Sequence, residues 1–97
     1  MIYKYKARFT KAFRHRDSHD CQRITETVEQ IQSFFETRQA PEGLGLTKLF
    51  SREGLGAVFE ARATLALRIL FSVQQETVTF LMVGDHDEVR RFIRTFQ

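Results

Sequence analysis

Three short segments in the second half of the chain alternate apolar residues with polar ones, and this pattern restricts the fold more than any other. The segments cover roughly residues 57–63, 67–73 and 77–83. Alternation with a period of two is typical of strands that bury one face. The connections between the segments have only a few residues, too few for a parallel crossover. We therefore predict an antiparallel β-meander.

The core-facing side chains set the register of the first two strands, because a slip by one residue would turn every side chain to the other face. We expect this face to carry odd-numbered residues only: Ala57, Phe59, Ala61, Ala63, Leu67, Ile69, Phe71 and Val73. A three-residue turn at 64–66 satisfies this condition. The predicted opposed pairs are Phe59 with Phe71, Ala61 with Ile69, and Arg62 with Arg68.

A two-residue turn at Gln75-Glu76 sets the register of the third strand. The predicted pairs are Val73 with Val78, Phe71 with Phe80, and Ile69 with Met82. In this register Val83 lies beside Arg68. His86 then leaves the sheet at the end that carries Arg62 and Arg68.

The N-terminal residues alternate in the same way. One face of the segment carries Tyr3, Tyr5, Ala7 and Phe9, and the other carries Lys4, Lys6 and Arg8. This alternation predicts a half-buried first strand. Further along, between Lys11 and about Gln39, apolar residues recur with the period of a helix. A break at 17–20, where Asp and Ser favour an N-cap, predicts a short helix followed by a long one.

The rest of the chain completes the outline. Residues 39–46 contain the only proline and two glycines, which indicates a loop, and Lys48-Leu49-Phe50 is compatible with a short extended segment. Asp85 and Glu88 resemble a capping box in front of helically spaced apolar residues. We predict one α+β domain over residues 1–97. It has an N-terminal strand, a helical pair, an antiparallel β-meander and a short C-terminal helix, in the order β-α-α-β-β-β-α.

The composition excludes several classes of protein. No apolar run approaches the roughly 20 residues of a membrane span. The first residues lack the apolar block of a secretory signal, so we expect a cytoplasmic protein with no membrane partner. Cys21 is the only cysteine and has no metal-ligand spacing with the three histidines, so we expect no disulfide, metal or other cofactor. A net charge of +3 favours a polyanion or an acidic protein as the partner.

The opposed arginines of the meander define a candidate site. Like charges that face each other on a sheet cost free energy unless an anion lies between them. Glu60, one step from Arg62 on the same face, supplies part of this compensation. A phosphate held by both guanidinium groups would supply it better, because the arginine fork matches phosphate oxygens. A solvated face with splayed arginines is the alternative.

His86 adds a second chemical group at this end of the sheet. The imidazole lies between Asp85 and Asp87 and close to the two arginines. Histidine can gain and lose a proton near neutral pH, so His86 could move protons to or from a ligand of the arginines. A solvated residue at the start of a helix is the alternative.

Four segments follow one another in an order that is known from one protein family: Lys48-Leu49, Phe59-Glu60-Ala61-Arg62, Leu67-Arg68-Ile69-Leu70-Phe71 and Gly84-Asp85-His86-Asp87-Glu88-Val89. Together with the predicted order of strands and helices, they resemble the RelE/ParE superfamily of toxins from bacterial and archaeal type II toxin-antitoxin systems. The resemblance covers nearly the whole chain and is sharpest over residues 48–94. It implies a RelE-like fold and a cognate antitoxin protein as a partner.

The resemblance also implies roles for individual residues. Arg68 matches the phosphate-contacting arginine of the family, and Arg62 matches a basic residue of the preceding strand that contacts RNA. His86 stands where some subfamilies, YafQ among them, have a histidine that donates a proton. Glu60, in contrast, stands where the RelE pattern has a basic residue. The C-terminal tyrosine of several members is absent from this sequence.

The leading hypothesis is a ribosome-dependent mRNA endoribonuclease that works without a metal. RNA cleavage of this kind needs a base for the 2′-hydroxyl, a cation for the phosphorane and an acid for the leaving oxygen. We expect Arg68 and Arg62 to hold the scissile phosphate and His86 to be the acid. Glu60 is either the base or a residue that orients an arginine. The predicted RNA-binding residues are Lys48, Lys4, Lys6 and Arg8.

Two other hypotheses fit the same resemblance. ParE members share the fold, act on DNA gyrase and have no ribonuclease site, so the chain could be a non-catalytic toxin. Glu60 and the missing tyrosine favour this alternative. A decayed toxin that keeps the fold and binds its antitoxin is the third hypothesis.

Overall fold

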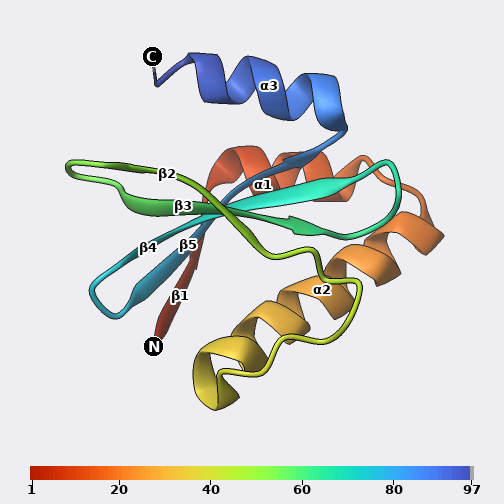
Figure 1. Ribbon diagram of the computed structural model, residues 1–97. Coiled ribbons are helices and arrows are strands. Elements are labelled where there is room, and N and C mark those ends of the chain that lie inside the picture. Colours follow the sequence, from red (N-terminus) through yellow and green to blue (C-terminus); the bar gives the residue numbers. More distant parts are fainter. Residues whose placement is uncertain (97) are drawn as a thin grey trace.

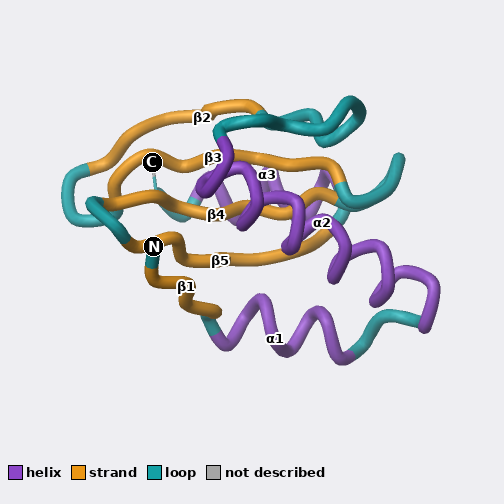
Figure 2. The backbone as a smooth tube through the Cα atoms, turned by 90° about the horizontal axis from the view of Figure 1, so that it is seen from below, coloured by secondary structure: helices purple, strands orange, loops and turns teal. Residues whose placement is uncertain are grey.

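The computed structural model describes residues 1–96, which form three helices and a five-stranded mixed sheet (Figure 1). The elements are β1 (Ile2–Tyr5), α1 (Ala7–Arg14), α2 (Ser18–Thr37), β2 (Thr47–Arg52), β3 (Gly56–Arg62), β4 (Arg68–Gln74), β5 (Thr77–Gly84) and α3 (His86–Arg94). The strand order across the sheet is β1-β5-β4-β3-β2 (Figure 2). Strands β2 to β5 form an antiparallel meander, and β1 pairs with β5 in parallel. The predicted α+β class is confirmed.

Helices cover both faces of the sheet. Phe9 of α1 and Ile24 of α2 pack against the face that carries Phe71. Val89 of α3 packs on the opposite face, over Leu70. Figure 1 shows α3 and α2 on opposite sides of the strands. No helix within residues 1–96 has both the length and the apolar character needed to cross a bilayer.

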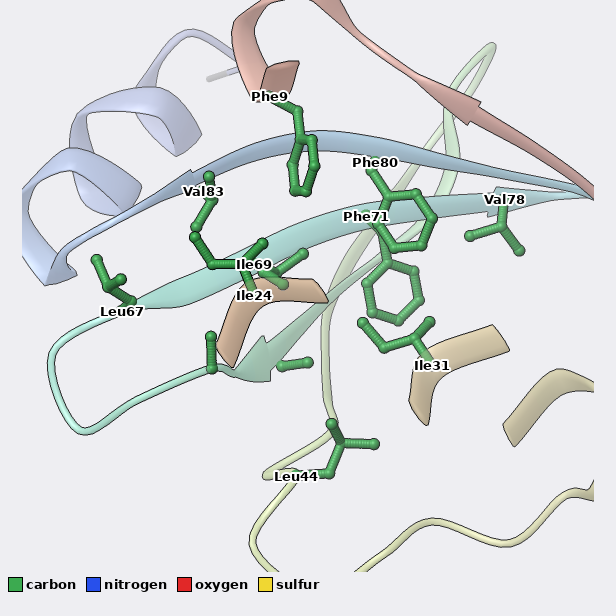
Figure 3. Packing of buried hydrophobic residues seen from close by; sticks show 12 residues of the cluster. Phe9, Ile24, Ile31, Leu44, Leu67, Ile69, Phe71, Val78, Phe80 and Val83 are labelled. Carbon is green, nitrogen blue, oxygen red and sulfur yellow. The ribbon is translucent and has the colours of Figure 1, made fainter. Parts of the chain in front are cut away.

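Phenylalanine rings form the centre of the core between the sheet and α2 (Figure 3). Phe71 is fully buried, and its ring stacks on that of Phe59, the opposed residue of β3, with 5.4 Å between centroids. Phe35 of α2 meets Phe71 edge-on, and Phe80 of β5 lies against it at a tilt, both at 6.0 Å. Such aromatic pairs stabilise by about 0.5–1.5 kcal/mol each beyond the area that they bury. The odd-numbered face predicted for β3 and β4 is therefore the face that packs on α2.

The first strand is shorter than predicted, because it ends at Tyr5 and α1 begins at Ala7. The last sheet bond of this segment runs from Lys6 N to Phe80 O. Beyond it, Phe9, Ala12 and Phe13 have helical i, i+3, i+4 spacing, and all three pack into the core. The helical spacing of these three residues therefore prevails over the alternation that suggested a longer strand.

The register of β5 departs from the prediction at one point. The pairs Val73 with Val78 and Phe71 with Phe80 are confirmed, but Ile69 pairs with Val83 rather than with Met82. A β-bulge between Phe71 and Leu70 leaves Leu81 of β5 as an extra residue. Arg68 consequently faces Gly84 instead of lying beside Val83. The bulge lets β5 bury residues on both faces, because α3 covers the face that the simple alternation left to solvent.

The segment around Lys48 is a complete edge strand of six residues, β2, rather than a short extended piece. It pairs with β3 and has its own bulge between Lys48 and Phe50. The predicted caps are present: Asp17 accepts from Asp20 N at the start of α2, and Asp85 and Glu88 form a reciprocal capping box at the start of α3. These caps fix where both helices begin.

Candidate functional site

The candidate site lies at the β3–β4 turn, on the sheet face that α3 covers only in part. Arg62 and Arg68 are opposed across β3 and β4, as predicted. Glu60 lies two residues before Arg62 on the same face of β3. The side chains of Glu60 and Arg68 are only 22% and 21% exposed. Their charges therefore interact more strongly than those of a solvated pair.

The guanidinium group of Arg68 is fixed by four contacts. Nε forms an ion pair with Glu60 Oε1, 3.1 Å away. Nη1 points at three carbonyl oxygens of the turn, at 3.1 to 3.4 Å: those of Thr64, Leu65 and Leu67. Within residues 1–96, Nη2 has no hydrogen-bond partner. Nη2 is thus the nitrogen that is available to an anion.

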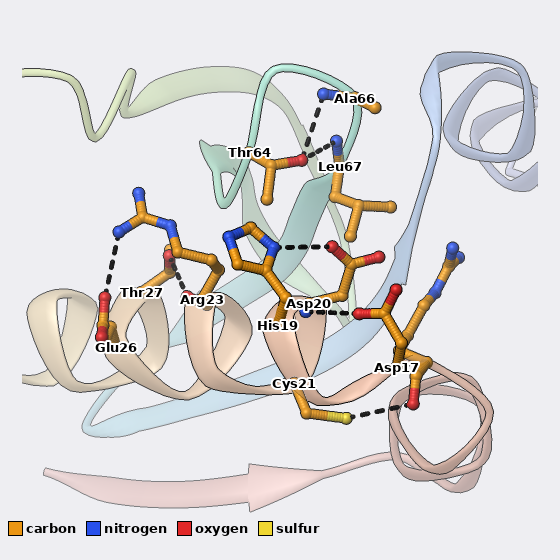
Figure 4. A network of polar contacts seen from close by, with 11 residues as sticks. Asp17, His19, Asp20, Cys21, Arg23, Glu26, Thr27, Thr64, Ala66 and Leu67 are labelled. Carbon is orange, nitrogen blue, oxygen red and sulfur yellow. Dashed lines mark hydrogen bonds and ion pairs between the residues drawn. The ribbon is translucent and has the colours of Figure 1, made fainter.

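The turn that holds Arg68 is itself ordered by Thr64. The Thr64 hydroxyl oxygen accepts from the backbone N–H groups of Ala66 and Leu67, at 3.1 and 3.0 Å (Figure 4). Leu67 O accepts from Ala63 N and Thr64 N. These bonds hold the turn carbonyls in position around the Arg68 guanidinium. No role for Thr64 was predicted. The signal in the sequence is a threonine at the start of a turn, because its hydroxyl can bond to nearby backbone groups.

A hollow of about 300 Å³ opens between this turn and the start of α3. It is lined by Leu65, Ala66, Arg68, Asp85, His86 and Asp87. The structure thus brings together Arg68 and His86, two of the four residues predicted to be catalytic. The N-terminal end of α3 also meets the hollow, and the helix dipole favours an anion there. A guanidinium, an imidazole and a helix N-terminus could hold a phosphate group there, beside the carboxylates of Asp85 and Asp87.

Arg62 does not line this hollow, although its backbone is opposite that of Arg68. Its N–H donates to Leu44 O at 2.7 Å, and its exposed side chain extends along Gly45. A Cβ added at Gly45 would be 3.4 Å from Arg62 Cβ and 3.8 Å from Nε. Glu60 thus pairs with the guanidinium of Arg68, and the loop at Gly45 lies along the side chain of Arg62. The ion pair offsets part of the like-charge cost from which a bridging phosphate was inferred.

The predicted RNA-binding residues lie away from the hollow. Lys48 is opposite Phe59, whose ring packs beneath α2, so Lys48 belongs to the other face of the sheet. Lys4 and Lys6 line a separate polar hollow of about 550 Å³ beside β5. Arg8 lies on α1 rather than on a strand, and its guanidinium carbon is 5.0 Å from the centroid of the Phe92 ring of α3.

One group of side chains within residues 1–96 has the chemistry of metal ligands. The ligand atoms of Asp17, His19 and Asp20 all lie within 4.8 Å of one another at the start of α2. Asp17 Oδ1 accepts from Asp20 N at 2.8 Å, and His19 Nδ1 is 3.6 Å from Asp20 Oδ1 (Figure 4). Capping and pairing account for this arrangement, and we assign no metal to it.

The fold and the hollow together define a small α+β protein with a candidate site between a β-turn and a C-terminal helix. Comparisons with protein-family models and with curated proteins find no match. Solved structures do match over nearly the whole chain. The RelE–RelB complex from Pyrococcus horikoshii OT3 is 19% identical with a TM-score of 0.67, and the match covers 87% of this chain and 92% of that one.

Two further complexes give the same result. The RelB–RelE antitoxin-toxin complex from Methanococcus jannaschii is 18% identical, with a TM-score of 0.64 and coverage of 92% of this chain and 96% of that one. The DinJ–YafQ toxin-antitoxin complex of E. coli is 15% identical, with a TM-score of 0.62 and coverage of 90% and 93%. The chain therefore has the fold of the RelE and YafQ toxins, as the resemblance in sequence implied. At these identities the likeness establishes the fold, and the activity has to be argued from the site.

Proposed function

We propose that this chain is the toxin of a type II toxin-antitoxin module and cleaves mRNA on the ribosome, which inhibits translation in the cytoplasm. The observation that carries the proposal is the hollow in which Arg68 and His86 meet beside the N-terminus of α3. Similar folds occur in complexes with the antitoxins RelB and DinJ, which supports a cognate antitoxin as the partner. No metal or cofactor is part of the proposed chemistry.

The proposed reaction is an attack of the ribose 2′-oxygen on the adjacent phosphorus. A base removes the 2′-hydroxyl proton, the new P–O bond forms, and the bond to the 5′-oxygen breaks. The 5′-oxygen leaves with a proton from His86, and a 2′,3′-cyclic phosphate remains. Arg68 Nη2 and the start of α3 stabilise the charge that builds on the phosphate oxygens.

The two carboxylates near this site have different roles in the proposal. Glu60 is engaged with Nε of Arg68, so we assign it to orienting that arginine rather than to proton transfer. Asp87 is exposed, lines the hollow and is the first-turn carboxylate of α3 that is outside the capping box. Asp87 is therefore the group available to take the 2′-hydroxyl proton.

The experiment is a cell-free translation reaction in which mRNA ends are mapped by primer extension. The native chain should produce cuts that are in phase with codons and require ribosomes. Arg68→Ala should reduce cleavage by about 10²–10³, as for the loss of one donor to a developing anion. His86→Ala should reduce it by about 10²–10⁴, as for the loss of a general acid. Arg14→Ala, an exposed arginine of α1 that lies outside the hollow, is the control.

A non-catalytic toxin that binds DNA gyrase is the second candidate, and the contacts of Arg68 favour it. Four of the interactions of this guanidinium are internal to the protein, as expected for a structural arginine. Intact mRNA at toxin concentrations that arrest growth would overturn the ribonuclease proposal. Inhibition of gyrase supercoiling by the same protein would then establish the alternative, and inactivity in both assays with retained antitoxin binding would indicate a decayed toxin.

A further inference from the structure

A second hollow, of about 460 Å³, lies between α1 and the beginning of α3. Its lining consists of Arg8, Lys11, Ala12, His15, Arg16 and Glu88. Arg8, Lys11, Ala12 and His15 have i, i+3, i+4, i+7 spacing, so they form one stripe along α1. The contact of Arg8 with Phe92 shows that this stripe faces α3. The stripe and Arg16 place four basic side chains around one concave surface.

The charges of this α1–α3 hollow are not balanced from within. Its one carboxylate, Glu88, accepts from Asp85 N at 3.0 Å and from Arg16 Nη2 at 3.4 Å. Within residues 1–96, the side chains of Lys11 and His15 have no ion-pair or hydrogen-bond partner. The hollow therefore keeps an excess of positive charge that an anion could neutralise.

The distribution of charge over the helices points to the same side of the molecule. Helix α1 carries Arg8, Lys11 and Arg14 and no acidic residue. Helix α2 carries one arginine, Arg23, and four acidic residues: Asp20, Glu26, Glu29 and Glu36. A polyanion is therefore attracted to the α1 side of the protein and repelled from the outer face of α2.

The α1–α3 hollow is next to the candidate active site. Glu88 lines it, and the three preceding residues, 85–87, line the hollow that holds Arg68. The two hollows thus lie on either side of the first turn of α3. A strand that occupies both hollows would pass over this turn.

We propose that the α1–α3 hollow binds the phosphate backbone of RNA and leads the strand toward Arg68 and His86. This inference rests on the proposed ribonuclease function and adds to it the path of the substrate. Arg8 and His15 are seven residues apart, about 10 Å along the helix axis. Over that length the stripe can contact more than one phosphate of a single strand.

The hollow suits RNA better than an acidic protein segment. Protein interfaces depend on apolar and aromatic anchors at their centre. The large apolar side chains that are exposed within residues 1–96 are Met1, Ile2, Tyr5 and Leu65, and none of them belongs to α1 or α3. A concave basic surface without such anchors is typical of backbone contacts to nucleic acid, whose affinity comes from released counterions.

The test measures the affinity of a fluorescein-labelled, 20-nucleotide single-stranded RNA by fluorescence anisotropy over a range of salt concentrations. Lys11→Glu is compared with Arg14→Glu, which changes the net charge equally on the same helix but lies outside the hollow. Lys11→Glu should weaken binding about tenfold and reduce the slope of log K against log salt by about 0.7, the value for one lost phosphate contact. Arg14→Glu should weaken binding less than threefold. Thermal melting of both variants confirms that they fold.

Equal effects of the two substitutions would overturn the inference, because net charge alone would then explain them. A polyglutamate peptide of matched charge that binds the native chain as tightly as the RNA, and loses affinity with Lys11→Glu, would assign the hollow to an acidic protein instead. The cleavage assay separates this result from the function itself. If the native chain cuts mRNA in phase with codons but Lys11→Glu and Arg14→Glu bind RNA equally well, only the α1–α3 path is refuted. If Lys11→Glu alone loses affinity and the native chain cuts no mRNA, only the ribonuclease proposal is refuted.

Discussion

The ion pair between Glu60 and Arg68 gives the most informative test of how this site works. Glu60→Gln removes the negative charge of the ion pair, in which Arg68 Nε is 3.1 Å from Glu60 Oε1, and keeps the size of the side chain. The other three contacts of the guanidinium, with the turn carbonyls, do not depend on Glu60. The substitution therefore weakens one of four restraints on Arg68 and leaves its surroundings intact.

The size of the effect follows from the exposure of this ion pair. Exposed ion pairs contribute about 0.2–1 kcal/mol, and this pair, at about one-fifth exposure, belongs at the upper end of that range. We expect Glu60→Gln to cost about 1 kcal/mol, which lowers the melting temperature of a domain of this size by about 4–8 °C. If the lost 1 kcal/mol adds fully to the activation free energy, because Arg68 is held less firmly in place, the rate of cleavage falls about fivefold.

The assay is codon-phased mRNA cleavage as a function of pH, with thermal melting of the same samples. Glu53→Gln, which makes the same change at an exposed glutamate of the β2–β3 turn, is the control and should leave both quantities unchanged. The pH dependence of the Glu60→Gln variant should keep the shape of the native profile. A loss of cleavage of a hundredfold or more, together with the loss of the acidic limb, would refute the orienting role and identify Glu60 as the general base.

Two further predictions concern stability. Asp85 Oδ1 accepts from Glu88 N at 2.8 Å, so Asp85→Ala should lower the free energy of unfolding, measured by urea titration, by about 1 kcal/mol. Asp85→Asn keeps an acceptor oxygen and should retain most of that free energy. Equal losses in the two variants would show that the cap does not stabilise the protein. Burial raises the pKa of Tyr3, with further contributions from Glu36 and Tyr5, so the unfolded chain releases this proton at a lower pH than the folded one. Stability should consequently fall as the pH rises above about 10, the ordinary value for tyrosine, and up to the raised pKa. Tyr3→Phe should make this fall shallower in urea titrations between pH 8 and 11, and parallel curves for the two proteins would contradict the assignment.

The candidate site was only partly predictable from the sequence. Arg68 and His86 were predicted to meet, because the short turns and the capping box fix where β4 begins and where α3 starts. The position of the Arg62 side chain outside the hollow was not predictable, because it depends on the loop at Gly45, which is remote in sequence. The engagement of Arg68 by the turn carbonyls was also missed. It depends on a side-chain conformation, which an alternation pattern does not encode.

What the sequence determined by itself is local: the period of each segment, the caps of α2 and α3, and the β3–β4 register set by a short turn. These features depend on residues that are close in the chain, so their physical causes can be found there. Contacts between distant segments decided the rest. Because of these contacts, β1 pairs with β5 and residues 7–9 are helical instead of extended. They also account for the bulge at Leu81 and for the position of α3 on the second face of the sheet. In each case two conformations of a segment would bury different apolar side chains. Which of the two is more stable depends on the other segments of the core that the side chains can contact.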